Sequence, residues 1–114
     1  MYEYQARVTR VIDGDTLALD LDLGLGIHAH LPRARLSGVD CPELPTPEGI
    51  AAANFTTRWV AEHGPVFNVV TSKDRRDVYG RYLVSVRTLA IDGPVLNLEL
   101  LHAGAAKPYQ GVQP

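Results

Sequence analysis

The feature that most restricts the fold of this chain is a strict alternation of leucine with small or acidic residues. Its members are Leu17, Leu19, Leu21 and Leu23 against Ala18, Asp20 and Asp22. A period of two is typical of a β-strand that buries one face, here the leucine face. The pair Asp13-Gly14 separates this strand from an extended segment at residues 4–13, which is the strongest short-range signal for a β-hairpin. A second Asp-Gly pair, at 92–93, carries the same signal.

Three further segments are expected to be strands, at residues 27–39, 66–72 and 82–89. Gly24 and Gly26 break the chain before the first of them. Pro32 within it indicates a bulge or an edge position, because proline has no N–H to donate to a sheet.

The longest helix is predicted to begin after Thr46, which suits the N-cap, with Pro47 at the first helical position. His63-Gly64-Pro65 is typical of a helix end. Three residues at helical spacing form its apolar face: Ala52, Phe55 and Trp59. A shorter helix that ends at Gly104 follows the second Asp-Gly pair, with an apolar face of Leu96, Leu100 and Ala103.

The resulting order β-β-β-α-β-β-α predicts a mainly β, α+β fold. We expect a five-stranded OB-type barrel, with one helix between strands 3 and 4 and a short helix after strand 5. A length of 114 residues predicts a single domain over residues 1–114.

Composition excludes several classes of protein. No apolar run approaches the roughly 20 residues of a membrane-spanning helix. Cys41 is the only cysteine, so an intrachain disulfide and a multi-cysteine zinc site are excluded. The N-terminus lacks a basic region followed by an apolar one, which favours a cytoplasmic or phage-encoded protein over a secreted one.

Charge is distributed unevenly between the two kinds of basic residue. The net charge is −2, so the molecule as a whole is not a basic protein that binds polyanions. Among its eleven cationic residues, nine are arginine and two are lysine. Arginine is the fork-shaped donor suited to phosphate and carboxylate. Ordinary surface composition in a GC-rich genome explains the same bias.

Three segments concentrate charge where a packed barrel gains nothing from it, at residues 13–16, 33–43 and 77–81. They supply hard oxygen ligands or bases in Asp15, Asp40 and Glu43, and forks for phosphate in Arg35 and Arg81. That inventory is typical of a metal-assisted phosphodiester hydrolase. Each segment alone also fits a simpler interpretation: a turn, an Asx-turn with a surface carboxylate, and a loop ion pair.

Four motifs occur in order over most of the chain, from Arg7 to Lys107. They are "VIDGDT", "RLSGVDCPE", "DVYGRYL" and "DGPVLNLELLHAGAAK". With them the chain resembles the staphylococcal (micrococcal) nuclease family. That family has an OB-barrel fold and cleaves DNA and RNA phosphodiesters with Ca²⁺. The resemblance therefore implies nucleic acid as substrate and Ca²⁺ as cofactor.

The resemblance also assigns the metal and base positions. It implies that Asp15 and Asp40 bind Ca²⁺ through their carboxylates, with the backbone carbonyl of Cys41 as a further ligand. Glu43 would orient or deprotonate the attacking water. The turn itself needs only Asp13-Gly14, so the extra aspartate that follows is interpreted as the ligand.

Phosphate contacts and supporting positions are implied in the same way. Arg35 and Arg81 would clamp the scissile phosphate, with Arg81 toward the leaving oxygen, and Tyr79 would contact a phosphate. Three residues fall on supporting positions, in the turn or beside the loop of Arg81: Asp13, Thr16 and Asp77.

This chain departs from the family at several places. Cys41 stands where the best-known members have threonine, and Val78 where a lysine often precedes the tyrosine. The loop at 44–46 is short and lacks lysines. We expect a compact member without the family's C-terminal helix, in which Tyr109 stands in for a nucleotide-stacking tyrosine.

Three other functions remain open. The first is a non-catalytic OB-fold module that binds nucleic acid or protein. The second is a zinc enzyme that uses His28 and His30 with His63 or His102. The third is a thiol nucleophile at Cys41, which has no neighbouring histidine or lysine in sequence to lower its pKa. The sequence leaves the oligomeric state undecided and slightly favours a monomer.

Overall fold

The computed structural model describes residues 2–73 and 82–108. Strand β1 (Tyr2–Asp13) and strand β2 (Thr16–Asp22) form the expected hairpin. Asp13 pairs with Thr16, so the two turn residues are Gly14 and Asp15. The prediction that Asp13-Gly14 is the turn was therefore wrong by one residue, because Asp13 still belongs to the strand ladder.

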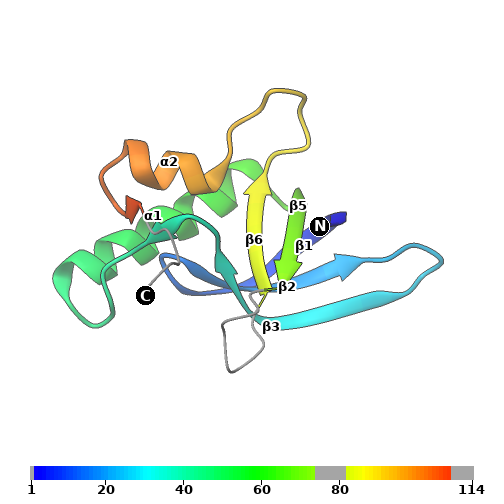
Figure 1. The fold of residues 1–114 in the computed structure, drawn as a ribbon, viewed down its shortest axis with the longest axis horizontal. Coiled ribbons are helices and arrows are strands. Elements are labelled where there is room, and N and C mark those ends of the chain that lie inside the picture. Colours follow the sequence, from blue (N-terminus) through cyan, green and yellow to red (C-terminus); the bar gives the residue numbers. More distant parts are fainter. Residues whose placement is uncertain (1, 74–81, 109–114) are drawn as a thin grey trace.

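Five strands close into a barrel in the order β1-β2-β3-β6-β5, which confirms the OB-type expectation (Figure 1). Strand β3 spans His28–Leu36, β5 Val66–Lys73 and β6 Tyr82–Arg87. Strands β3 and β6 run parallel, and the other neighbours in the barrel run antiparallel.

The third predicted strand, 27–39, is interrupted. Strand β3 ends at Leu36, and Gly38 turns the chain with a φ of 76° in the left-handed region that favours glycine. The two residues after the turn, β4 (Val39–Asp40), pair with β7 (Lys107–Pro108) in a separate small sheet. This pairing joins segments far apart in the sequence and was not predicted.

Helix α1 (Pro47–His63) begins as expected. The Thr46 side chain accepts a hydrogen bond from the backbone N–H of Gly49 at 3.0 Å, and Pro47 occupies the first turn. Its apolar face packs on the barrel through Ala52 and Trp59, and the Trp59 ring stacks on Phe67 of β5 at a centroid distance of 5.5 Å.

The second Asp-Gly pair does not form a hairpin. It lies in the connection from β6 to helix α2 (Leu96–His102), where Asp92 has a φ of 60°. A Cβ on Gly93 would overlap the hydroxyl of Thr88, so glycine is required there for space. The chain turns at this pair and then folds as the predicted helix, and Arg87 and Val95 on either side of the turn form an isolated bridge.

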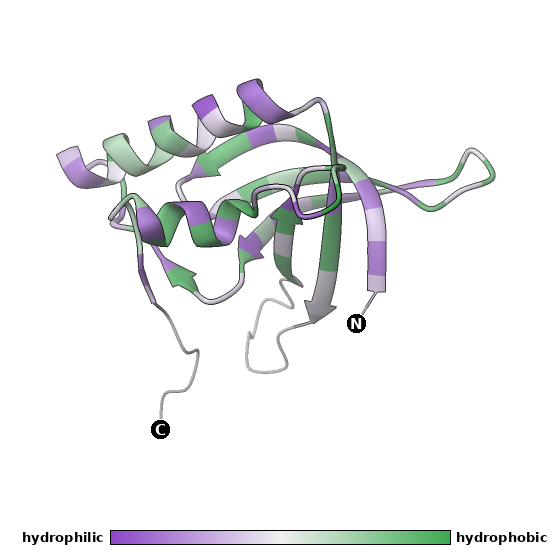
Figure 2. Cartoon of the chain, turned by 90° about the horizontal axis from the view of Figure 1, so that it is seen from above, coloured by the Kyte–Doolittle hydropathy of each residue, from purple (hydrophilic) through white to green (hydrophobic). Residues whose placement is uncertain are grey.

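The hydrophobic core consists of fully buried side chains from the barrel strands and from helix α2. The largest of them are Phe67, Leu17, Leu19, Leu36, Leu96 and Leu100. Beyond the barrel, β2 and β3 continue as a projecting arm with apolar residues at its tip (Figures 1 and 2). Leu23 lies at this tip and is 44% exposed, so its assignment to the buried leucine face was wrong. Within the described residues, no helix is long and apolar enough to cross a membrane.

Candidate active site

The carboxylate of Asp15 lies buried in the β1–β2 turn, with 5% of the residue exposed. One oxygen, Oδ2, accepts a hydrogen bond from the backbone N–H of Cys41 at 2.9 Å, and the other accepts one from the Thr16 hydroxyl at 3.2 Å. The backbone N–H of Asp15 donates to Asp13 Oδ1 at 3.1 Å. Asp13 and Thr16, two of the expected supporting residues, thus both contact Asp15.

The turn that carries Asp15 is held from two sides. The Thr56 hydroxyl of α1 donates to the carbonyl of Gly14 at 2.8 Å, and the backbone N–H of Leu36 donates to the carbonyl of Asp15 at 2.8 Å. A Cβ on Gly14 would lie 2.8 Å from both Ala52 Cβ and Cys41 Sγ. Since the φ of Gly14 is outside the left-handed region, this glycine is needed for close packing and not for its backbone conformation.

Arg35 of β3 bridges the two carboxylates that the sequence proposed as metal ligands. Its Nη1 lies 3.4 Å from Asp15 Oδ2, and its Nη2 lies 3.3 Å from Asp40 Oδ1. The same Nη2 donates to the carbonyl of Val39 at 3.2 Å. Residues of β3, of β4 and of the β1–β2 turn therefore meet around a single guanidinium.

Burial dominates the electrostatics of Asp15. It raises the pKa of this carboxyl to about 6, and a hydrogen bond with Asp13 adds to the increase, while the Cys41 N–H and the Arg35 charge lower it. A carboxyl whose pKa is raised on folding contributes stability below its unfolded pKa and loses that contribution as the pH rises through about 6. At neutral pH the folded protein therefore holds an ionised carboxylate at a desolvation cost, which a nearby cation offsets.

The donor chemistry fits a hard cation such as Ca²⁺, because carboxylate and backbone carbonyl oxygens are its preferred ligands. Asp15 and Asp40 already face one cationic group, and the carbonyl of Cys41 belongs to the residue whose N–H binds Asp15. Side chains alone do not complete such a site: in residues 2–73 and 82–108, no three His, Cys, Asp or Glu side chains are grouped so that they could hold a metal ion.

The remaining predicted residues are not brought into this cluster by described contacts. Glu43 is exposed, and its backbone carbonyl accepts from the Thr46 hydroxyl at 2.6 Å at the start of α1. Asp77, Tyr79, Arg81 and Tyr109 lie outside the described residues. Their predicted roles, and that of the Glu43 carboxylate, stay predictions.

The geometry bears on two of the alternative functions. Burial raises the pKa of the Cys41 thiol to about 12, and the neighbouring Asp15, Asp13 and Asp40 add to the increase, so almost no thiolate exists at neutral pH. His28 pairs with Asp20 on the arm at 3.1 Å, whereas His63 packs against Trp59 at the end of α1. The part of the chain that is described thus offers no three-ligand zinc centre.

Two buried polar residues that support this region were missed in the sequence. Thr56 holds the Gly14 carbonyl, and Asn97 of α2 accepts from Val86 N–H at 3.1 Å and donates to the carbonyl of Ser37 at 2.9 Å. Helical spacing offered a signal for both. Thr56 lies four residues after Ala52, and Asn97 lies three before Leu100, so each polar residue falls on an apolar face.

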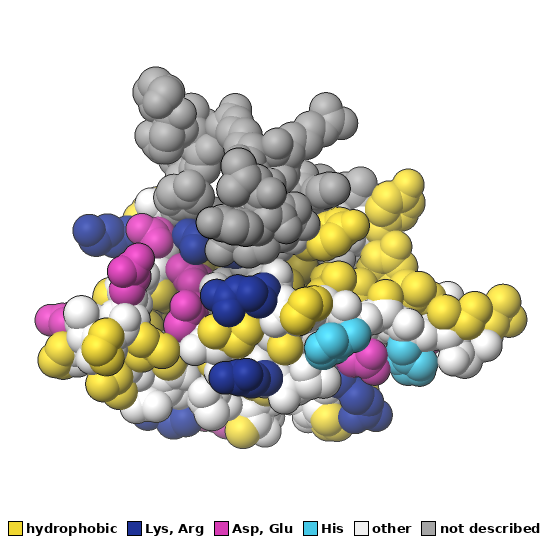
Figure 3. All heavy atoms as spheres, turned by 90° about the horizontal axis from the view of Figure 1, so that it is seen from below, with side chains coloured by type: hydrophobic (Ala, Val, Ile, Leu, Met, Phe, Trp, Pro, Cys, Tyr) yellow, Lys and Arg dark blue, Asp and Glu magenta, His cyan; other side chains and the backbone are white. Residues whose placement is uncertain are grey.

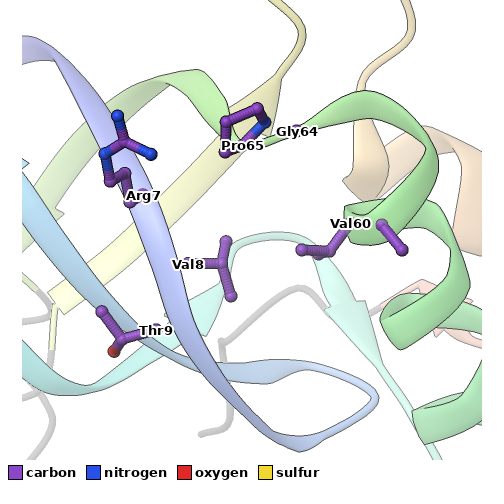
Figure 4. Close-up of a pocket in the computed structure, with 7 residues that line it drawn as sticks. Arg7, Val8, Thr9, Val60, Gly64 and Pro65 are labelled. Atoms are coloured by element: carbon purple, nitrogen blue, oxygen red, sulfur yellow. The ribbon is translucent and has the colours of Figure 1, made fainter.

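A pocket lies elsewhere, between β1 and the C-terminal end of α1. Figure 4 shows that Val8 and Val60 point into it and that Arg7, Gly64 and Pro65 surround it. None of the predicted site residues lines this pocket. The cluster around Arg35 is therefore a site of converging charges and separate from this pocket.

Comparison with known proteins gives the family. A profile described as "Staphylococcal nuclease homologue" matches residues 33–114, which include Arg35, Asp40, Cys41 and Glu43. This chain belongs to the staphylococcal nuclease family. A member from Staphylococcus intermedius, named thermonuclease, is 33% identical over 106 residues. The match covers 88% of this chain and 56% of the relative, so the chain spans little more than half the length of that protein.

Membership confirms the resemblance inferred from the four motifs and places the chain in a nuclease family with an OB-like barrel. The family match begins at residue 33, whereas Asp13 and Asp15 precede it. The hydrogen bond from Cys41 N–H to Asp15 Oδ2 joins the two parts.

Proposed function

We propose that this protein is a Ca²⁺-dependent phosphodiesterase that hydrolyses DNA, RNA or both by attack of water on the phosphate. The observation that carries the proposal is the bridge of Arg35 between the buried Asp15 and the half-exposed Asp40. Two carboxylates held within 3.4 Å of one guanidinium supply the opposite charges that a phosphoryl transfer site requires.

Each residue of the candidate site would have a separate role in this reaction. Asp15, Asp40 and the Cys41 carbonyl would hold the cation, which supplies Lewis-acid stabilisation of the phosphate oxygens. The Cys41 N–H fixes Asp15 Oδ2, so the buried carboxylate keeps one orientation. Arg35 would exchange its carboxylate contacts for a bidentate contact with the phosphate, which carries the charge of the transition state.

Glu43 is proposed as the residue that orients or deprotonates the attacking water, and Arg81 as the donor at the leaving oxygen. Glu43 lies three residues after Asp40, and the N-cap of α1 fixes its backbone through Thr46. Its exposed carboxylate is therefore mounted on a fixed backbone and remains able to meet solvent water.

The test is incubation of the protein with plasmid and single-stranded DNA or RNA, each with Ca²⁺, Mg²⁺, Zn²⁺ or EDTA. We expect cleavage with Ca²⁺, little with Mg²⁺ because that ion demands near-octahedral geometry, and none with EDTA. Full activity in EDTA would contradict the proposed mechanism. Retention of oligonucleotide without cleavage under any condition would instead identify a non-catalytic binding module.

A further inference from the structure

The outer face of strand β3 carries cations in line with the candidate active site. Ala34 and Leu36 are fully buried and point into the barrel, so Arg35 between them points outward, and Arg33, next to Ala34 at the bulge of the strand, is exposed. Their Cα atoms are two residues apart, roughly 7 Å along a strand. Arg35 is the residue that bridges Asp15 and Asp40, and Arg33 is its nearest exposed neighbour along β3.

A second arginine lies across the same face. Arg10 of β1 pairs with Ala18 of β2, and on its other side Ala18 faces the bulge of β3 that contains Arg33. Leu17 and Leu19 point inward, so Ala18 points outward, yet only 6% of it is exposed. Side chains from the flanking strands must cover it, and the aliphatic stems of Arg10 and Arg33 are placed to do so.

Neither of these two arginines is neutralised by the rest of the described structure. In residues 2–73 and 82–108, Arg10 and Arg33 make no hydrogen bond or ion pair, whereas Arg35 contacts two carboxylates. Two like charges on either side of one alanine repel each other without a counter-charge. Figure 3 shows basic side chains on this face between an acidic group on one side and histidines on the other.

The row has a defined end. Two pairings further along the β1–β2 ladder, Arg7 lies opposite Asp20, and Asp20 contacts His28 at 3.1 Å. From this point toward the tip of the arm, the outward face of β2 carries the acidic side chains Asp20 and Asp22 in place of Ala18. The arginine row on this outer face therefore consists of three residues, Arg35, Arg33 and Arg10.

We propose that Arg33 and Arg10 bind successive backbone phosphates of the single nucleic-acid strand that runs out of the candidate active site. The inference rests on the proposed function for its direction, because it treats Arg35 as the scissile-phosphate contact. Unpaired arginines complement the phosphodiester backbone, and one row of cations fits one strand. The two residues position substrate and take no part in bond cleavage.

The test is binding of a fluorescent single-stranded 20-mer in EDTA, measured by anisotropy over a series of salt concentrations. The variants are Arg10→Gln and Arg33→Gln, alone and combined, since glutamine keeps much of the stem that covers Ala18. Arg58→Gln is the control, because Arg58 is exposed on α1. Thermal unfolding of each variant checks that the fold is kept.

Each lost phosphate contact should reduce the slope of log K against log salt by about 0.7, so the double variant should lose about 1.4 while Arg58→Gln changes neither slope nor affinity. A wild-type slope in the double variant would overturn the proposal. A loss confined to duplex DNA would overturn the assignment to a single strand.

A cleavage assay separates this inference from the proposed function. With Ca²⁺, the double variant should cleave a small p-nitrophenyl phosphodiester at the wild-type rate and lose activity only on long substrates. If the wild type cleaves nothing, the proposed function fails while the salt slopes still decide whether the row binds nucleic acid. Equal loss on small and long substrates would contradict a positioning role.

Discussion

Replacing Thr56 by valine should destabilise the protein through the turn that carries Asp15. The Thr56 side chain is fully buried, and its hydroxyl donates to the Gly14 carbonyl at 2.8 Å. Valine has nearly the same shape, so the change removes the hydrogen bond and leaves a buried carbonyl without that donor. Loss of one partner from such a pair costs about 1–3 kcal/mol of the free energy of unfolding.

The corresponding shift in melting temperature follows from the size of the chain. For a domain of about this length, 1 kcal/mol lowers Tm by about 4 °C, so we expect a decrease of about 4–12 °C in a calorimetric scan. Calcium affinity, measured by titration calorimetry, should fall as well, because the released turn no longer holds Asp15 against Cys41.

The adjacent residue offers a matched control. Thr57 is exposed, and its hydroxyl donates to the Ala53 carbonyl within the same helix at 2.8 Å. Thr57→Val makes the same chemical change with the same difference in helix propensity, and should alter stability by less than about 0.5 kcal/mol. The reasoning is refuted if Thr56→Val and Thr57→Val melt at the same temperature.

Four more outcomes are expected. Gly14→Ala should lower unfolding free energy by about 1–3 kcal/mol in denaturant titrations, because its Cβ would meet Ala52 and Cys41 at 2.8 Å; unchanged stability would contradict this packing. Arg35→Lys should reduce kcat by roughly 10²-fold or more although charge is kept, and a near-wild-type rate would exclude the phosphate clamp. Glu43→Gln should reduce turnover and leave calcium affinity mostly intact; the opposite pattern would make Glu43 a ligand. Cys41→Ser and Cys41→Thr should keep activity within about tenfold, whereas folded, calcium-binding but inactive variants would point to a thiol nucleophile.

The elements of this fold were largely predictable because their signals are local. The period of two in β2 and the Thr46–Pro47 start of α1 depend on residues close in sequence, and both are present in the structure. Local signals gave wrong predictions where the structure of a residue depends on its pairing partner or on the part of the barrel that covers it. Asp13 is a strand residue and not a turn residue because Thr16 pairs with it, and Leu23 is exposed because β2 leaves the barrel before reaching it.

The list of candidate site residues likewise came from the sequence, through motif order and the carboxylate and arginine chemistry it contains. Only the tertiary structure decided how they meet. The Asp15 carboxylate contacts the Cys41 N–H across 26 residues, and Thr56 reaches the Gly14 carbonyl across 42. A sequence pattern determines which groups are available and which face of an element is apolar. The position of Arg35 between Asp15 and Asp40 depends on the closure of the barrel, which brings β3, β4 and the β1–β2 turn to one point.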